Sequence, residues 1–124
     1  MTLFGTDGIR ARAGEGPLEL ERVRALARSV VRVLRGQGIQ GLDRKARTIT
    51  RRPKILLGRD PRASGPEIAA SLTAGFVEAG ADVLDVSVIP TPAVALLCAR
   101  GDHDLGVVVS ASHNPAEYNG IKLI

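Results

Sequence analysis

The spacing of apolar positions predicts an amphipathic helix over residues 19–35. Apolar residues recur there at intervals of three or four, which places them on one face of a helix. They are Leu20, Val23, Leu26, Ala27, Val30, Val31, Val33 and Leu34. Arginines occupy other positions on its surface, and we expect Gly36 and Gly38 to end the helix.

Short apolar segments further along predict strands that alternate with helices. The strands are expected at residues 54–58, 82–88, 105–109 and 120–124. One helix should begin after the tight loop of residues 59–65, with Ser64 as its cap and Pro66 in its first turn, and stop at Gly80. A second should follow the break at residues 90–92 and run to about Arg100.

This alternation is typical of the α/β class. It predicts a three-layer α/β/α sandwich with a mostly parallel sheet and helices on both of its faces. The last predicted strand is cut off by the carboxyl end at Ile124. Natural domains usually finish at exposed positions, so we expect this domain to be truncated there.

Residues 36–53 form a polar, glycine-punctuated segment that we interpret as a basic loop or insertion. The net charge is +4, and much of the excess lies in or beside this segment, at Arg44, Lys45, Arg47, Arg51, Arg52 and Lys54. A solvated loop and a nucleic-acid surface are the two interpretations. No aromatic residues alternate with these charges, as base stacking would require, so we expect no nucleic-acid partner. The positive charge would help an anionic substrate in either case.

The remaining composition narrows the class of protein. Apolar residues make up 44% of the chain, enough for a core, but no apolar run approaches the roughly 20 residues of a membrane span. The amino end lacks a basic region followed by an apolar stretch, so we expect neither a secretory signal nor a membrane partner. Cys98 is the only cysteine, and we expect it to serve packing in a protein of the reducing cytoplasm.

Several polar residues gather just after the predicted strand at 105–109. They are Ser110, Ser112, His113 and Asn114, with Asn119 and Lys122 a little further on. Ligands in open α/β sheets sit at the carboxyl ends of strands. Pro115 restricts the backbone of Asn114 and stiffens this turn.

Three interpretations of this turn can be compared. A serine hydrolase is disfavoured, because the Gly-x-Ser-x-Gly elbow is missing and neighbouring Ser112 and His113 side chains would diverge. An ordinary polar turn fits the composition. Phosphoryl transfer also fits, because it needs mainly positioning and positive charge, which Arg10, His113 and Lys122 can supply. The residues alone leave the last two interpretations open.

Four motifs in order resemble the α-D-phosphohexomutase family over nearly the whole chain. They are Phe4-Gly5-Thr6-Asp7-Gly8-Ile9-Arg10, Gly58-Arg59-Asp60-Pro61-Arg62-Ala63-Ser64-Gly65, Val88-Ile89-Pro90-Thr91-Pro92, and Ser110-Ala111-Ser112-His113-Asn114-Pro115 with Asn119-Gly120-Ile121-Lys122. The resemblance is to the amino-terminal domain I. It implies an intramolecular phosphotransferase that interconverts hexose 6-phosphate and 1-phosphate through a bisphosphorylated sugar.

The resemblance also implies roles for residues of the active-site segment. Ser112 matches a serine that carries a phosphate and binds Mg²⁺ through it, one ion per complete site. Lys122 matches a lysine that assists proton transfer, and Arg10 an arginine close to the phosphoserine. His113, Asn114, Ser110 and Asn119 match the loop around that serine.

Other matched residues are expected to be structural. Asp60 and Arg62 resemble residues that fix a loop, and Asp7 would organise the opening loop. His103 matches no motif and is expected in an exposed loop. Ala11 and Pro61 depart from the family pattern, where Gly and Thr are usual.

The resemblance leaves the sugar and the full site open. The metal-binding, sugar-binding and carboxyl-terminal phosphate-binding domains would lie beyond Ile124, so we expect the chain alone to turn over no hexose phosphate. The motifs favour glucosamine phosphate as substrate, with phosphomannomutase or phosphoglucomutase activity as the alternative. A non-catalytic module that binds a sugar phosphate or a protein is the alternative of another class, and no oligomeric state is predicted.

Overall fold

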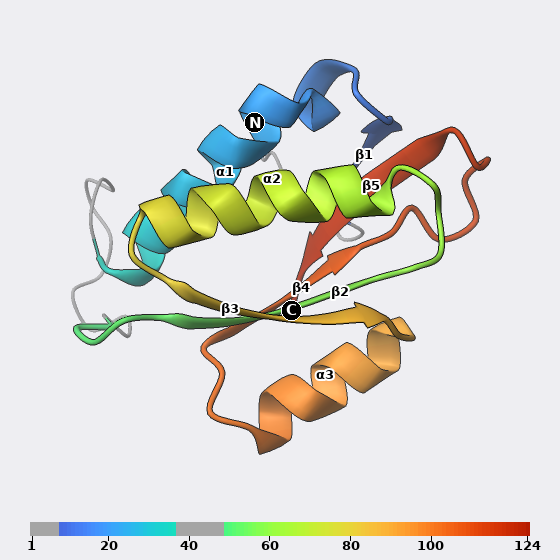
Figure 1. Cartoon of the computed structure of the whole chain (residues 1–124). Coiled ribbons are helices and arrows are strands. Elements are labelled where there is room, and N and C mark those ends of the chain that lie inside the picture. Colours follow the sequence, from blue (N-terminus) through green and yellow to red (C-terminus); the bar gives the residue numbers. More distant parts are fainter. Residues whose placement is uncertain (1–7, 37–48) are drawn as a thin grey trace.

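A single sheet of five strands organises the part of the chain that the structure describes (Figure 1). The computed structural model describes residues 8–36 and 49–124. The strands are β1 Ile9–Arg12, β2 Lys54–Arg59, β3 Asp82–Val88, β4 Leu105–Val109 and β5 Tyr118–Leu123. They lie in the order β1-β5-β4-β2-β3.

Helices cover both faces of this sheet, as the sequence predicts. Figure 1 shows α1 (Leu20–Leu34) and α2 (Gly65–Glu78) side by side on one face and α3 (Thr91–Arg100) on the other. A short 3₁₀ turn, η1 (Gly16–Leu18), leads into α1. The three-layer α/β/α sandwich is therefore confirmed.

The sheet is mixed. Strand β2 pairs in parallel with β3 and β4, whereas β5 pairs antiparallel with both β4 and β1, so four strands point one way and β5 points back. The connection from β4 to β5 contains no helix. A link this short can join only antiparallel neighbours, since a parallel crossover needs a dozen or more residues.

Three strands differ from the prediction. Strand β2 ends at Arg59, one residue after the expected Gly58. Strand β5 begins at Tyr118, two residues before the expected Gly120. Strand β1 was not expected, because only Ile9 among its four residues is buried and the sequence shows no apolar run. Its pairing with β5, from Ile9 opposite Ile121 to Arg12 opposite Tyr118, is a tertiary contact that local periodicity does not reveal.

The main core lies between the sheet and the α1–α2 layer. It takes Val23, Ala27 and Val31 from α1, all essentially inaccessible to solvent. The predicted apolar face of this helix was too wide, since Leu20 and Val33 are 38% and 45% exposed. A smaller cluster under α3 consists of Leu56, Val94 and Val108, with Val86, Ile89 and Cys98 packed against it.

The ends of the first two long helices differ in how well they were predicted. Gly36, in the left-handed conformation (φ 71°), follows α1 as expected, whereas Gly38 and most of the basic segment lie outside the described residues. Ser64 immediately precedes α2 and Pro66 lies in its first turn, as expected, but the expected side-chain cap was wrong. The Ser64 side chain makes no capping bond and instead accepts a hydrogen bond from Asn119 Nδ2 at 2.9 Å. Its backbone is already helical, which is unlike the extended conformation of a capping residue.

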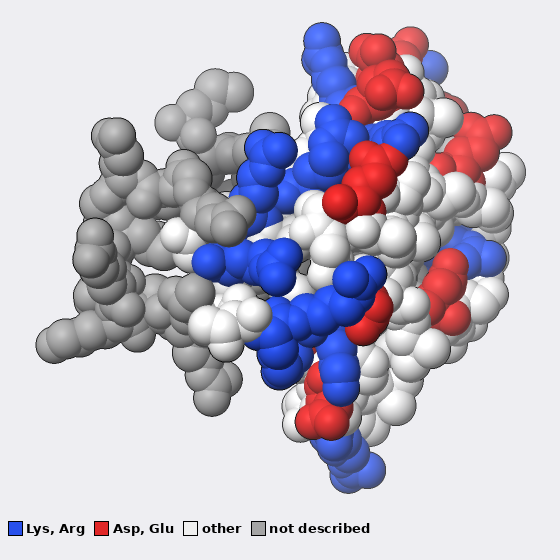
Figure 2. Space-filling model, turned by 60° about the vertical axis from the view of Figure 1, so that its left-hand side comes forward, with Lys and Arg blue, Asp and Glu red and all other residues white. Residues whose placement is uncertain are grey.

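Basic side chains gather on the face shown in Figure 2, with acidic side chains between them. Several are paired. The ion pairs are Arg24 and Arg28 with Glu78, Arg51 with Asp104, Arg52 with Asp82, and Lys54 with Asp102. Much of the local positive charge is therefore balanced by nearby carboxylates. No helix within the described residues combines the length and apolar character that a membrane crossing requires.

Gly75 allows α1 and α2 to approach closely, and its replacement gives a first test of the fold. A Cβ there would overlap the Arg24 carbonyl oxygen and lie 2.7 Å from the Ala27 Cβ. We expect Gly75→Ala to lower the free energy of unfolding by about 1–3 kcal/mol, despite the better helix propensity of alanine. Chemical denaturation measures it. Thr73→Ala, on the partly exposed part of the same helix, should be neutral or slightly stabilising; equal effects would contradict the close packing.

Candidate active site

The serine loop, residues 110–117, connects β4 to β5 and lies at the carboxyl end of β4. The loop after β2, residues 60–64, lies beside it because β2 and β4 are parallel neighbours whose carboxyl ends meet at one edge of the sheet. A backbone hydrogen bond from the Asp60 N–H to the Val109 carbonyl, 3.0 Å long, joins the two loops at their base.

Ser112 lies on the exposed side of the serine loop with an unusual backbone. Its φ is 52°, in the left-handed region that residues with a Cβ seldom occupy. Its N–H donates to Ser110 Oγ at 3.1 Å, and the Asn114 N–H closes a turn on the Ala111 carbonyl at 3.0 Å. Strain of this kind clusters at functional sites.

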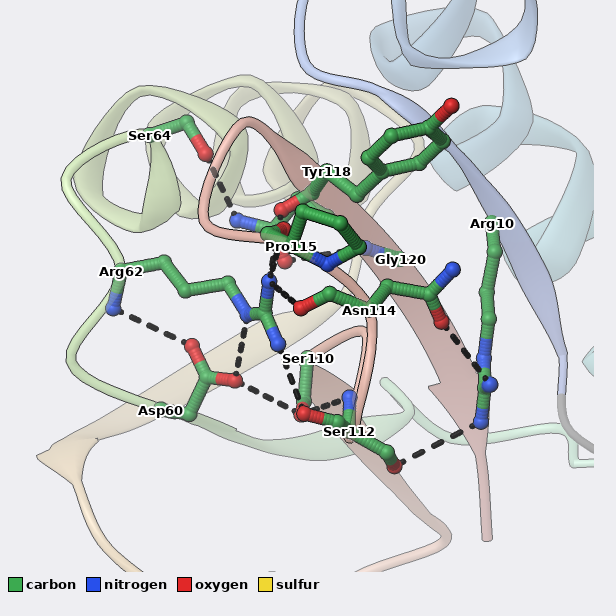
Figure 3. A network of polar contacts seen from close by, with 11 residues as sticks. Arg10, Asp60, Arg62, Ser64, Ser110, Ser112, Asn114, Pro115, Tyr118 and Gly120 are labelled. Atoms are coloured by element: carbon green, nitrogen blue, oxygen red, sulfur yellow. Dashed lines mark hydrogen bonds and ion pairs between the residues drawn. The ribbon is translucent and has the colours of Figure 1, made fainter.

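Arg10 brings a positive charge to this hydroxyl from the edge strand β1. Its guanidinium donates from Nη2 to Ser112 Oγ at 3.4 Å and from Nη1 to Asn114 Oδ1 at 3.1 Å, as Figure 3 shows. Arg10 and Ser112 are 102 positions apart in the sequence and meet because β1 pairs with β5. A group transferred to or from Ser112 Oγ would therefore lie against this cation.

Lys122 lies on the same face of the sheet as Arg10. It pairs with Val108 of β4 and is two residues from Gly120, which pairs with Arg10. Among the described residues, no hydrogen bond joins Lys122 or His113 to Ser112. His113 is exposed beside Ser112, and Lys122 is half-buried. The structure thus brings Arg10, Ser112 and Asn114 into contact and places Lys122 on the adjoining strand.

Two expected loop residues lie behind Ser112. Ser110 donates a hydrogen bond from Oγ to Asp60 Oδ2 at 2.8 Å. Asn119 is fully buried; its Nδ2 donates to Ser64 Oγ, and its Oδ1 accepts from the Gly120 N–H at 2.9 Å. These contacts tie the serine loop to the start of α2. The partnership of Asn119 with Ser64 was missed, since no local pattern signals a contact across 55 positions.

Arg62 donates hydrogen bonds to three backbone carbonyl oxygens of the serine loop and to one at the start of β5. Nη1 donates to the carbonyls of Asn114 (2.9 Å), Pro115 (2.7 Å) and Tyr118 (3.1 Å), and Nη2 donates to that of Ser112 (2.7 Å). Nε pairs with Asp60 Oδ2 at 2.9 Å (Figure 3). The planar five-donor guanidinium suits such a fan of acceptors. The expected structural role of Asp60 and Arg62 stays a proposal, and Asp7 lies outside the described residues.

The charge on Asp60 is stabilised by this network. Partial burial raises the pKa of the Asp60 carboxyl, but the hydrogen bonds from Ser110 and Arg62 together lower it, and the net pKa is below the ordinary value. A carboxyl whose pKa is depressed on folding stabilises the folded chain above its unfolded pKa. That contribution is lost as the pH falls through the folded pKa.

The pH dependence of Asp60→Asn tests this network. We expect the variant to be less stable than the parent chain near neutral pH, with a difference that shrinks in acid below the ordinary aspartate pKa of about 3.9. Urea denaturation between about pH 7 and pH 3 measures this difference. Asp82→Asn, which removes an exposed carboxylate, controls for the loss of one negative charge. A difference for Asp60→Asn that persists unchanged into acid would contradict the assignment.

A metal site would need ligands besides those of the described residues. No group of three or more His, Cys, Asp or Glu residues that could hold a metal ion occurs within residues 8–36 and 49–124. A phosphate on the exposed Ser112 Oγ would add oxygen ligands of the kind that Mg²⁺ prefers. Among the described residues, a phosphate on Ser112 is the group whose chemistry fits such an ion.

The fold and the serine loop together define a three-layer α/β domain that presents a strained, arginine-bound serine at its sheet edge. The sequence model described as phosphoglucomutase/phosphomannomutase, alpha/beta/alpha domain I, matches residues 1–124. The chain belongs to this family.

Individual relatives agree with this placement. The chain is 48% identical over 120 residues to a phosphoglucosamine mutase from Clavibacter sepedonicus and 50% identical over 121 residues to one from Saccharopolyspora erythraea. These matches cover 97% and 98% of the chain but only 25% of each relative, so the chain spans about a quarter of their length. A crystal structure of a phosphoglucomutase/phosphomannomutase family protein from Burkholderia thailandensis superposes with a TM-score of 0.75 at 32% identity, covering 98% of this chain and 25% of that one.

Proposed function

We propose that this chain is the serine-bearing domain of a phosphoglucosamine mutase and that Ser112 carries the phosphate exchanged with the sugar. The observation that carries the proposal is the exposed Ser112 Oγ, 3.4 Å from the Arg10 guanidinium. A cation at that distance stabilises the negative charge of a phosphate on this oxygen. The rigid turn fixes the position of the oxygen, and phosphoryl transfer depends chiefly on such positioning.

The proposed reaction consists of two transfers through Ser112. In the first, a hydroxyl oxygen of the hexose phosphate attacks phosphoserine 112; the bond from Ser112 Oγ to phosphorus breaks, and a hexose bisphosphate forms. Lys122, on the same face of the sheet as Arg10, would accept the proton of the sugar hydroxyl. The bisphosphate then reorients. Its other phosphate returns to Ser112, and the proton returns to the sugar oxygen that is released.

Mg²⁺ is the proposed cofactor. A phosphate on Ser112 would be the ligand that this chain supplies, and the other ligands would come from outside the described residues. When bound, the ion would offset the negative charge of the transferred group. Arg10 would hold the phosphate from the protein side, and Asn114 would orient the Arg10 guanidinium through its Oδ1.

The substrate is proposed from the names of the relatives, several of which are phosphoglucosamine mutases. Glucosamine phosphate is therefore preferred to mannose or glucose phosphate. We also propose a cytoplasmic location, in keeping with a phosphorylated sugar as substrate and with the free thiol of Cys98.

Site-resolved mass spectrometry tests the proposal. The chain is incubated with Mg²⁺ and the 1,6-bisphosphate of glucosamine, glucose or mannose, and the phosphorylated residue is then mapped. We expect one phosphate, on Ser112, whichever sugar carries it, because the sugar-binding domain is expected outside this chain. The same chain should not interconvert the hexose monophosphates by itself. No phosphate on Ser112 from any bisphosphate would contradict the proposal.

A further inference from the structure

A closed ring of hydrogen bonds surrounds the Ser112 backbone. The Ser112 N–H donates to Ser110 Oγ (3.1 Å), and Ser110 Oγ donates to Asp60 Oδ2 (2.8 Å). The same Asp60 oxygen accepts from Arg62 Nε (2.9 Å), and Arg62 Nη2 donates to the Ser112 carbonyl (2.7 Å). The ring therefore holds the peptide groups on both sides of the Ser112 Cα (Figure 3).

Holding both peptide groups fixes the two torsions between them. A left-handed conformation costs a residue with a Cβ free energy, so it persists only where its surroundings impose it. The ring is well placed to do so, because the side chains of Arg62 and Asp60 are only 11% and 25% exposed and the charged bonds between them are strong. Arg62 also holds the carbonyl of Asn114, whose side chain accepts from Arg10.

We propose that Arg62 and Asp60 are positioning residues, which hold Ser112 in its left-handed conformation and thereby direct its Oγ toward Arg10. The inference deepens the proposed function and rests on it for the role of Ser112. Arg62 contacts residue 112 at its backbone carbonyl oxygen and acts through the Ser112 backbone. The planar guanidinium of Arg62 can bind the Asp60 carboxylate through Nε and the Ser112 carbonyl through Nη2 at the same time. A lysine ammonium has a single nitrogen and cannot form this planar pair of bonds.

Comparing the unfolding equilibrium constants of two Ser112 variants shows whether Arg62 imposes the left-handed backbone at Ser112 or only stabilises the loop in general. Ser112→Gly and Ser112→Ala both remove the hydroxyl, but only glycine is free of the left-handed penalty. With Arg62 in place, we expect the glycine variant to have an unfolding equilibrium constant about threefold smaller than that of the alanine variant. In an Arg62→Met background the ring is open and residue 112 can relax. The order should then reverse, because the unfolded state of the glycine variant has the greater entropy.

If Arg62→Met does not fold, the proposal can still be tested with Ser110→Ala and with an NMR measurement of the Ser112 backbone. Ser110→Ala opens the ring at the Ser112 N–H while leaving the Asp60–Arg62 pair intact. By NMR, the parent chain should show the strong amide–Hα NOE within Ser112 that marks a positive φ, and Ser110→Ala should lose it. Retention of this NOE together with an unchanged order of the glycine and alanine variants would overturn the proposal.

The rate at which Ser112 takes up phosphate tests whether the position of its backbone matters for the reaction. We expect Arg62→Lys to slow phosphorylation of Ser112 by a hexose 1,6-bisphosphate at least tenfold at saturating bisphosphate, with a smaller effect on the half-saturating concentration. Uptake at the parent rate would count against positioning. If the parent chain takes up no phosphate, the proposed function fails, while the NOE and the order of stabilities still decide whether the ring sets the Ser112 backbone.

Discussion

Ser112→Ala should reduce phosphate uptake from a hexose 1,6-bisphosphate to the background rate, a loss on the order of a thousandfold or more. The variant lacks the oxygen that would bond to phosphorus, and the nearby hydroxyl of Ser110 is not free to replace it. Ser110 Oγ is already engaged by Asp60 and by the Ser112 N–H. The alanine variant should fold normally, since it keeps the backbone contacts and removes one exposed hydroxyl. Intact mass spectrometry and circular dichroism measure the two outcomes.

Ser87 provides a closely matched control within the same chain. It is exposed, has a positive φ of 63°, and its Oγ accepts a hydrogen bond of 3.4 Å from Arg59, as Ser112 Oγ does from Arg10. The Asp85 carboxylate, however, pairs with Arg59 and accepts from the Ser87 N–H, so a phosphate there would meet a negative charge. Ser87→Ala should therefore leave phosphate uptake unchanged. Equal losses in both variants would show that the reaction does not belong to Ser112.

Gly120→Ala should destabilise the chain on the order of 3 kcal/mol. A Cβ on Gly120 would lie 2.5 Å from the Ile9 carbonyl oxygen and 2.6 Å from the Ser110 carbonyl oxygen. Ile9 pairs with Ile121 in the sheet, and the Ser110 N–H donates to the Gly120 carbonyl at 3.0 Å. These backbone atoms cannot move without separating β5 from β1 or displacing the base of the serine loop. The same substitution should thus impair phosphate uptake, because Arg10 pairs with Gly120 across the sheet.

Gly14→Ala distinguishes this steric effect from the ordinary cost of replacing glycine. Gly14 has a positive φ of 79°, and a Cβ there would meet nothing within 4 Å. Its replacement should cost only about 1 kcal/mol, from the left-handed backbone alone. Urea denaturation of both variants gives the comparison. A smaller loss for Gly120→Ala than for Gly14→Ala would contradict the close approach of the backbones.

The sequence predicts those parts of the fold that depend on local patterns. The periodic apolar positions locate α1, the proline and glycine signals at their ends locate α2 and α3, and the aliphatic runs locate β2, β3 and β4. Strand β1 and the reversed direction of β5 could not be derived in this way. They arise from pairing between residues about 110 positions apart, for example Ile9 with Ile121, and local periodicity carries no information on such pairs.

The sequence motifs predicted which residues belong to the candidate site, but not the contacts between them. The motifs indicate Ser112, Arg10 and Asn114, and the structure adds their contacts. The fan of bonds from Arg62 to four carbonyls depends on the fold of the serine loop and has no signature in residue types. Asn119 illustrates the same limit, since the residue types do not reveal that it lies buried against Ser64.

The central claim is that Arg10 holds a phosphate carried by Ser112, and a phosphorus NMR titration tests it most directly. The chain is prepared with phosphoserine at position 112, alone and together with Arg10→Gln. A nearby cation favours the doubly charged phosphate. The second pKa of the phosphoserine should therefore lie below its ordinary value in the parent chain and return toward it in the Arg10→Gln variant. An ordinary pKa in both proteins would contradict the account.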